Sequence, residues 1–168
     1  MRKLLFPLAL FIFSSPLFAN EVINLPTSCK VDKILNMVQC PLGDDISIDD
    51  AIDSMKLRAN VRNFKLVAHL PLSKQVMSMG EKSPRMEIFQ FCDALIAKRM
   101  VEYNKLFAGF LPCRIAVVAD AKGKGWLVTM NMDTMLQAAG MTPTLKKLGK
   151  TVRDSIYSIV SAGVNGDL

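Results

Sequence analysis

The segment 113–132 constrains the fold most, because it has the pattern of two strands joined by a tight turn. Residues 115–119 form an almost unbroken apolar run, and residues 126–132 follow with apolar side chains alternating along one face. The intervening residues 120–125, Asp-Ala-Lys-Gly-Lys-Gly, have the composition of a hairpin turn. A strand that is apolar at nearly every position is typical of a sheet covered on both faces. The segment therefore predicts an antiparallel hairpin with helices packed against it.

The rest of the chain supplies further strands and helices. Ser47, with Asp50 three residues later, predicts a helix start, and so does Thr142 followed by Pro143. We expect strands over 34–40, 64–70 and 85–92, and helices over 48–59, 74–79, 93–105, 133–139 and 143–162, with an apolar connector over 106–112. This order predicts an α+β fold in two layers, a mostly antiparallel sheet with helices packed on it.

The first nineteen residues have the three parts of a secretory signal peptide. A basic Met1-Arg2-Lys3 precedes an apolar run over 4–13, and Ala19 supplies a small residue at the cleavage point. The run is too short for a transmembrane helix, which needs about 20 apolar residues. We therefore expect a protein of the bacterial periplasm or the secreted fraction, without a membrane span after cleavage. Removing Arg2 and Lys3 lowers the net charge from +6 to +4.

All four cysteines, Cys29, Cys40, Cys92 and Cys113, follow the predicted signal. An even number in an oxidising compartment favours two disulfides, and three connectivities are possible. We favour Cys29–Cys40 and Cys92–Cys113, because each pair brackets one local excursion of the chain. A zinc site is the alternative, but the Cys-x-x-Cys pairs usual in zinc sites are missing.

The candidates for chemistry are few. His69, the only histidine, lies in an apolar strand and favours a structural role over a catalytic one. Cys92 precedes a helix start, where a thiolate is favoured, so thiol–disulfide chemistry is a possible alternative to a structural disulfide. Nucleophile-elbow and phosphate-loop motifs are missing from the sequence.

Methionines offer a second candidate site. Met77 and Met79, and Met130 and Met132, form two Met-x-Met pairs, and thioethers select Cu(I). Together with His69 they are our candidate residues for a ligand, copper or haem. Core filling is the alternative role for methionine. The metal stays unidentified, and we expect no cofactor.

The last predicted helix carries a basic stripe, Lys146, Lys147, Lys150 and Arg153. We interpret it as a solvated face. Export and the lack of interleaved aromatic side chains argue against nucleic-acid binding.

The stretch 46–162 resembles the bacterial family known as domain of unknown function 302. The resemblance rests on Phe91-Cys92-Asp93, on 111–115 (Leu-Pro-Cys-Arg-Ile), on the Asp120 turn and on the strand after it. At the first of these, Cys92-Asp93-Ala94 stands where the family has Cys-Asn-Pro. The resemblance implies a compact α+β domain, a matched Cys92–Cys113 pair and a homodimer, and it implies no established activity.

We therefore divide the chain into a signal peptide (1–19), a cysteine-bearing lead-in (20–45), the family-like domain (46–162) and a tail (163–168). We expect an exported, disulfide-stabilised binding or interaction module, not an enzyme, whose partner is a small ligand or a protein. The alternative is a periplasmic thiol-redox or copper/haem-handling protein.

Overall fold

The computed structural model describes residues 23–138 and 140–167, so the predicted signal peptide lies outside the described residues. One six-stranded antiparallel sheet forms the centre of the molecule, in the order β1-β2-β6-β5-β4-β3. This confirms the predicted α+β fold and the hairpin, whose strands β5 and β6 are neighbours. The strands are β1 (Lys30–Asp32), β2 (Met37–Pro41), β3 (Lys65–Leu70), β4 (Met86–Cys92), β5 (Cys113–Ala119) and β6 (Gly125–Met130).

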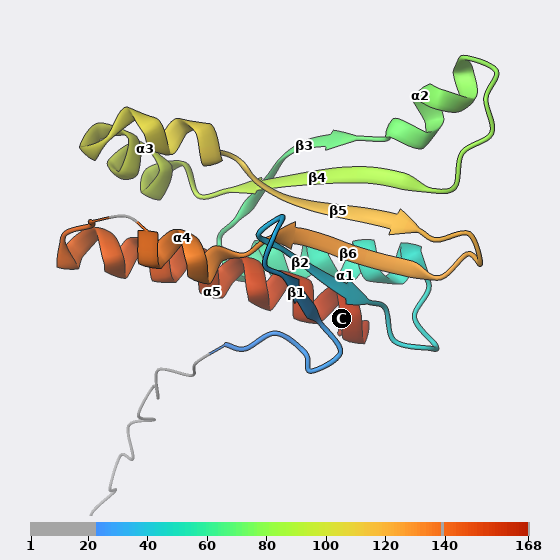
Figure 1. The fold of residues 1–168 in the computed structure, drawn as a ribbon, viewed down its shortest axis with the longest axis horizontal. Helices are drawn as coiled ribbons and strands as arrows, with labels where there is room; N and C mark the ends of the chain where they lie inside the picture. The colour runs from blue at the N-terminus through green and yellow to red at the C-terminus, as the bar shows by residue number, and fades with distance from the viewer. Residues whose placement is uncertain (1–22, 139, 168) are drawn as a thin grey trace, which may run out of the picture.

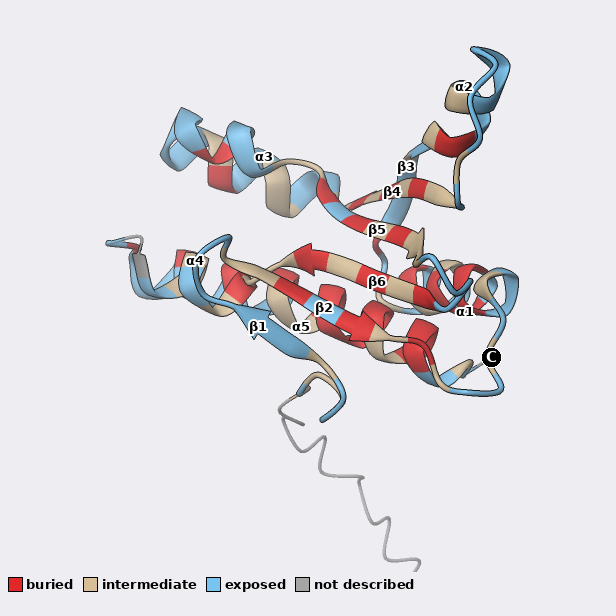
Figure 2. Ribbon diagram, turned by 45° about the vertical axis from the view of Figure 1, so that its right-hand side comes forward, coloured by how far each residue is buried: buried red, intermediate tan, exposed pale blue. Residues whose placement is uncertain are grey.

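Two helices, α1 (Ile48–Val61) and α5 (Pro143–Asn165), cover one face of the sheet, which we call the inner face (Figure 1). Ser47 caps α1 by accepting a hydrogen bond from the amide of Asp50, and Thr142 caps α5, as predicted. The core lies between these helices and the inner face, and the ribbon is red at its buried residues along β2, β4, β5, β6 and α5 in Figure 2. Gly163 lets α5 approach closely, because a Cβ there would lie 2.7 Å from Met55 Cγ.

The other helices lie at the two ends of the molecule. The short helix α2 (Leu72–Ser78) projects beyond the end of β3 (Figure 1). At the opposite end, α3 (Ala94–Tyr103) is followed by the 3-10 helix η1 (Lys105–Phe110), and α4 (Met132–Ala138) precedes α5. The Asp93 carboxylate caps α3 by accepting hydrogen bonds from the amides of Leu95 and Ile96.

Four predicted features differ from the structure. The strand expected over 34–40 begins only at Met37, as β2, because residues 33–36 form the turn of a hairpin with β1, where Asn36 adopts a left-handed conformation with φ of 54°. The expected connector over 106–112 is largely the helix η1, since Asn104 caps it by accepting a hydrogen bond from the amide of Leu106. Helix α5 continues past 162 to Asn165 and ends at Gly166, which is left-handed.

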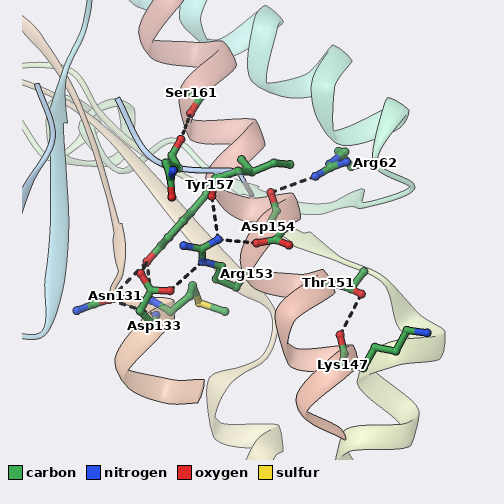
Figure 3. Close-up of polar contacts among 12 residues, drawn as sticks. Arg62, Asn131, Asp133, Lys147, Thr151, Arg153, Asp154, Tyr157 and Ser161 are labelled. Carbon is green, nitrogen blue, oxygen red and sulfur yellow. Dashed lines mark hydrogen bonds and ion pairs between the residues drawn. The ribbon is translucent and has the colours of Figure 1, made fainter. Parts of the chain in front are cut away.

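The fourth difference concerns Arg153, which does not belong to the solvated stripe. Its side chain is 12% exposed and donates to Asp133, to Asp154 and to the carbonyl oxygen of Ile23 (Figure 3). Its guanidinium also stacks over the Tyr157 ring, 4.7 Å from the ring centre. Arg153 thus joins α4, α5 and the N-terminal lead-in, a long-range role that a helical pattern does not reveal.

Candidate functional site

A cavity of about 440 Å³ lies between α3 and η1 on one side and the sheet with the starts of α4 and α5 on the other. Phe107, Phe110 and Met100 line it from the helices. From the sheet it is lined by Ile88, Cys92, Cys113, Arg114, Ala116, Val128, Thr129 and Met130. Its size falls within the range of small-molecule sites, about 300–1,000 Å³, and such sites are mostly apolar with a few polar groups. We call it the α3 cleft.

The α3 cleft exists because the sheet is not covered evenly. Along β5, Cys113, Ile115 and Val117 face α1 and α5 and are buried, whereas Arg114 is exposed and Ala116 half-buried. The expectation that both faces of this strand are covered is therefore wrong. The outer face, turned away from α1 and α5, is apolar but only partly covered by the chain.

A second cavity of about 320 Å³ adjoins the first across η1. The two share Phe107, Phe110, Met130 and Met135 in their walls, and Asn36 and Asn104 contribute polar groups to the second. The two cavities therefore adjoin each other at η1 and at the end of β6.

The structure confirms one of the two predicted disulfides. Cys29 and Cys40 are bonded, which fixes the start of β1 to the end of β2. Cys92 and Cys113 are free thiols, so the expected second disulfide is not formed. The strand register explains this. Cys113 lies opposite Phe91, so Cys92, the next residue along β4, points to the other face of the sheet.

Both free thiols are held in the neutral form. Burial, with the neighbouring Asp93 carboxylate, raises the pKa of Cys92, and burial with the nearby Cys92 raises the pKa of Cys113 to about 12. The sequence predicts that the start of α3 favours a Cys92 thiolate. It does not, because the Asp93 carboxylate already accepts the hydrogen bonds of the free amides at this helix start. Since the thiolate is the nucleophile and the metal ligand, these cysteines are poorly reactive at neutral pH.

The candidate residues for a ligand or metal divide into two groups. Met130 and Met132 line the α3 cleft, where Met37, Met100 and Met135 join them. His69, Met77 and Met79 do not line it, and both methionines are exposed on or next to α2. The predicted set is therefore not brought together at one site.

His69 has a structural environment instead. Its ring stacks on Phe89, and its Nε2 lies 2.5 Å from the carboxylate of buried Glu87. Arg85 also donates to Glu87 and pairs with Asp49 at the start of α1. Burial alone would raise the pKa of Glu87, but the contacts with Arg85 and His69 outweigh it and hold the pKa below its usual range. The polar contacts of His69, Glu87, Arg85 and Asp49 tie α1 to β3 and β4.

Sequence reasoning missed most of the cleft wall. Met37, Met100, Phe107, Phe110 and Arg114 were not candidates, because they come from separate elements. The available signal was the excess of apolar residues in segments 106–112 and 113–119, more than an internal connector and one strand face need. Among residues 23–138 and 140–167, the structure brings together no group of three or more His, Cys, Asp or Glu side chains suited to a metal ion.

The sheet, with a long helix packed on one face and an apolar cleft at one end, defines a compact α+β protein with a cavity of small-molecule size. The chain belongs to the family described as domain of unknown function DUF302, whose model matches residues 40–163. The fold is similar to the crystal structure of an uncharacterized conserved DUF302 protein from Bacillus stearothermophilus, with a TM-score of 0.63 and 19% identity over 76% of this chain and 98% of the other. No curated protein matches the chain.

Proposed function

We propose that this protein is an exported binding module that holds a small, mainly apolar molecule in the α3 cleft. The observation that carries the proposal is the uncovered outer face of β5 and β6. Ala116, Val128 and Met130 remain half-buried in a cavity of about 440 Å³ whose other lining residues include phenylalanine and methionine side chains. Apolar surface that the chain leaves partly open marks interaction sites, and burying it in a ligand is favourable.

Two further observations support export to the periplasm or the outside. The sequence begins with a signal-peptide pattern, and Cys29 and Cys40 form a disulfide. Disulfides persist in oxidising compartments and are rare in the bacterial cytosol. In the described residues no helix is long and apolar enough to cross a membrane.

The edge strand β3 supports the expected homodimer. Within residues 23–138 and 140–167, β3 pairs on one side only, with β4, and its other side leaves backbone groups open between exposed Leu66, Val67 and Leu70. An apolar edge without proline or a central charge is a ready partner for a second strand. We propose that a second copy of the chain pairs here. Sedimentation equilibrium of Val67→Lys, which charges this edge, is expected to give a monomer where the native chain gives a dimer.

The binding proposal is tested by filling the cleft. Ala116→Phe places a ring in it from the sheet, and Ala97→Phe does so from α3, since both alanines line the cavity. N-phenyl-1-naphthylamine, a neutral probe that fluoresces in apolar sites, is titrated into each purified protein. We expect saturable binding to the native chain and at least tenfold weaker binding to both variants.

Ala68→Phe is the matched control, because Ala68 is half-buried on β3 and lies outside both cavities. It should bind the probe as the native chain does. Unchanged binding in both cleft variants, with native circular dichroism, would show that the probe binds elsewhere and would refute the proposal.

One observation favours a second candidate function, handling of a soft metal or of redox equivalents. Two free thiols and five methionines line the same cleft. The raised thiol pKa values count against it. Thiol titration and elemental analysis of protein purified from the periplasm decide: bound copper, haem absorbance, or a Cys92–Cys113 disulfide reducible near the glutathione potential would favour this second function.

A further inference from the structure

We infer that the ligand of the α3 cleft is an aliphatic carboxylate, with its chain in the cleft and its carboxylate on Arg114. This inference rests on the proposed function and adds the chemical class of the ligand. Arg114 lies on β5 between buried Cys113 and Ile115, so its side chain leaves the sheet on the outer face, beside Ala116. It lines an otherwise mainly apolar cavity and is exposed to solvent.

The guanidinium of Arg114 has no acidic partner in the part of the chain that the structure describes. Arg85 and Arg153 each pair with two carboxylates, whereas Arg58, Arg62 and Arg99 share the lack of a carboxylate partner among the described residues; Arg114 differs from these three because it lines the cavity. The cross-strand neighbour of Arg114 is Gln90, which is neutral. An arginine fork matches a carboxylate with two parallel hydrogen bonds, so a carboxylate ligand would use this group fully.

The charges around the cleft favour an anion. Lys65 lies directly opposite Cys92 on the neighbouring strand, which places a second cation beside a residue of the cleft wall. Asp93 is the acidic residue that lines the cavity, and its Oδ1 accepts hydrogen bonds from the amides of Leu95 and Ile96. The positive end of α3 therefore offsets the charge of Asp93.

The two adjoining cavities favour a ligand with a long chain, because they share Phe107 and Phe110 in their walls. The adjoining cavity of about 320 Å³ continues the space beyond Phe107 and Phe110, so a chain that passes these side chains gains further apolar contact. Each methylene buried adds a roughly threefold to fourfold gain in affinity. A series of carboxylates should therefore gain affinity steadily with length and stop gaining once the space is filled.

The test compares decanoate with decanol, which has the same chain and no charge, in competition with N-phenyl-1-naphthylamine. We expect the native chain to prefer decanoate by about fivefold, the size of one partly exposed charge contact. Arg114→Gln should lower decanoate affinity to that of decanol and leave decanol unchanged. Arg99→Gln, which changes an exposed arginine of α3 outside the cavity, is the matched control and should retain the preference.

The outcomes separate this inference from the proposal beneath it. Equal binding of decanoate and decanol, or an Arg114→Gln variant that keeps the preference, overturns the carboxylate and leaves the apolar cleft standing. Failure of both compounds and of the probe overturns the cleft itself. Anionic phospholipid vesicles are tested as well. If the native chain binds these vesicles but not free decanoate, and Arg114→Gln does not bind them, the ligand is a lipid headgroup and the proposed free carboxylate is wrong.

Discussion

Removing the Cys29–Cys40 disulfide tests how the lead-in is attached to the domain. Cys40 lies in β2, is fully buried and belongs to the core, whereas Cys29 is half-buried at the start of β1. Cys29→Ala therefore breaks the crosslink without opening a hole in the centre of the core. The variant keeps β2 in place through its pairing with β6 and leaves β1 attached through β2 alone.

The expected loss of stability follows from the length of the closed loop. A crosslink between residues 11 positions apart restricts the unfolded chain by an entropy worth about 3 kcal/mol in the chain-entropy model. Strand β1 has three exposed residues, so in the variant it frays and recovers part of that entropy in the folded state. We therefore expect a loss of about 2–3 kcal/mol, and at a slope of about 2 kcal/mol per molar urea the midpoint falls by about 1–1.5 M.

Trp126, the only tryptophan, reports unfolding in urea through its fluorescence. Its indole donates a hydrogen bond to Asp120 in the β5–β6 hairpin, and on β6 it lies opposite Pro41, next to Cys40. Reductant should move the native midpoint to that of Cys29→Ala and leave the variant unmoved, and Cys92→Ser should respond to reductant like the native chain. A midpoint within 0.3 M of the native value in Cys29→Ala would refute the loop-entropy argument.

Three further predictions follow from the polar contacts. Asp93→Asn keeps the helix cap but removes a negative charge beside Cys92, so the pKa of the Cys92 thiol should fall. In a Cys113→Ser background, the pH profile of Cys92 alkylation should shift to lower pH, and an unchanged profile would contradict this cause. Because folding lowers the pKa of Glu87, the ionised carboxylate stabilises the fold above its ordinary pKa of 4.5, and this stabilisation is lost as pH falls through the folded pKa. Glu87→Gln should therefore have a lower melting temperature than the native chain at pH 7 and lose less of it between pH 5 and 3; parallel curves of melting temperature against pH would contradict this. Arg153→Met leaves two carboxylates and a carbonyl unpaired and should cost about 2–3 kcal/mol in urea unfolding, while Lys150→Met on the exposed face should change stability by less than about 0.5 kcal/mol.

Local patterns were sufficient for most of the fold. The caps at Ser47, Asp93 and Thr142 act within one helical turn, so the sequence places these helix starts correctly. The alternation along β4 likewise separates Phe89 and Phe91 from Ile88. The errors fall where distant contacts decide: Arg153 looks solvated on its helix but meets Ile23, far away in the sequence.

The site was less accessible to sequence reasoning for the same reason. Pairing Cys92 with Cys113 follows from spacing along the chain, whereas bonding depends on register across β4 and β5, where Cys113 meets Phe91. The methionine pairs were judged by their spacing as well. Met130 and Met132 line the cleft from the end of β6 and the start of α4, whereas Met77 lies on α2 and Met79 directly after it, outside the cleft.

The apolar run of β5 carries the clearest lesson about function. Its composition predicts two covered faces, and the described residues fully cover the inner one, with α1 and α5, but only partly cover the outer one. A half-buried apolar face is costly unless something else occupies it, since each 100 Å² of apolar surface left in water forgoes about 2.5 kcal/mol. Ile115 is fully buried on the inner face, whereas its neighbour Ala116 is only half-buried on the outer face. This difference locates the site, because it marks apolar surface that the fold leaves partly in water. Arg114, one position away, turns that uncovered face from a general apolar surface into one with a preference for negative charge.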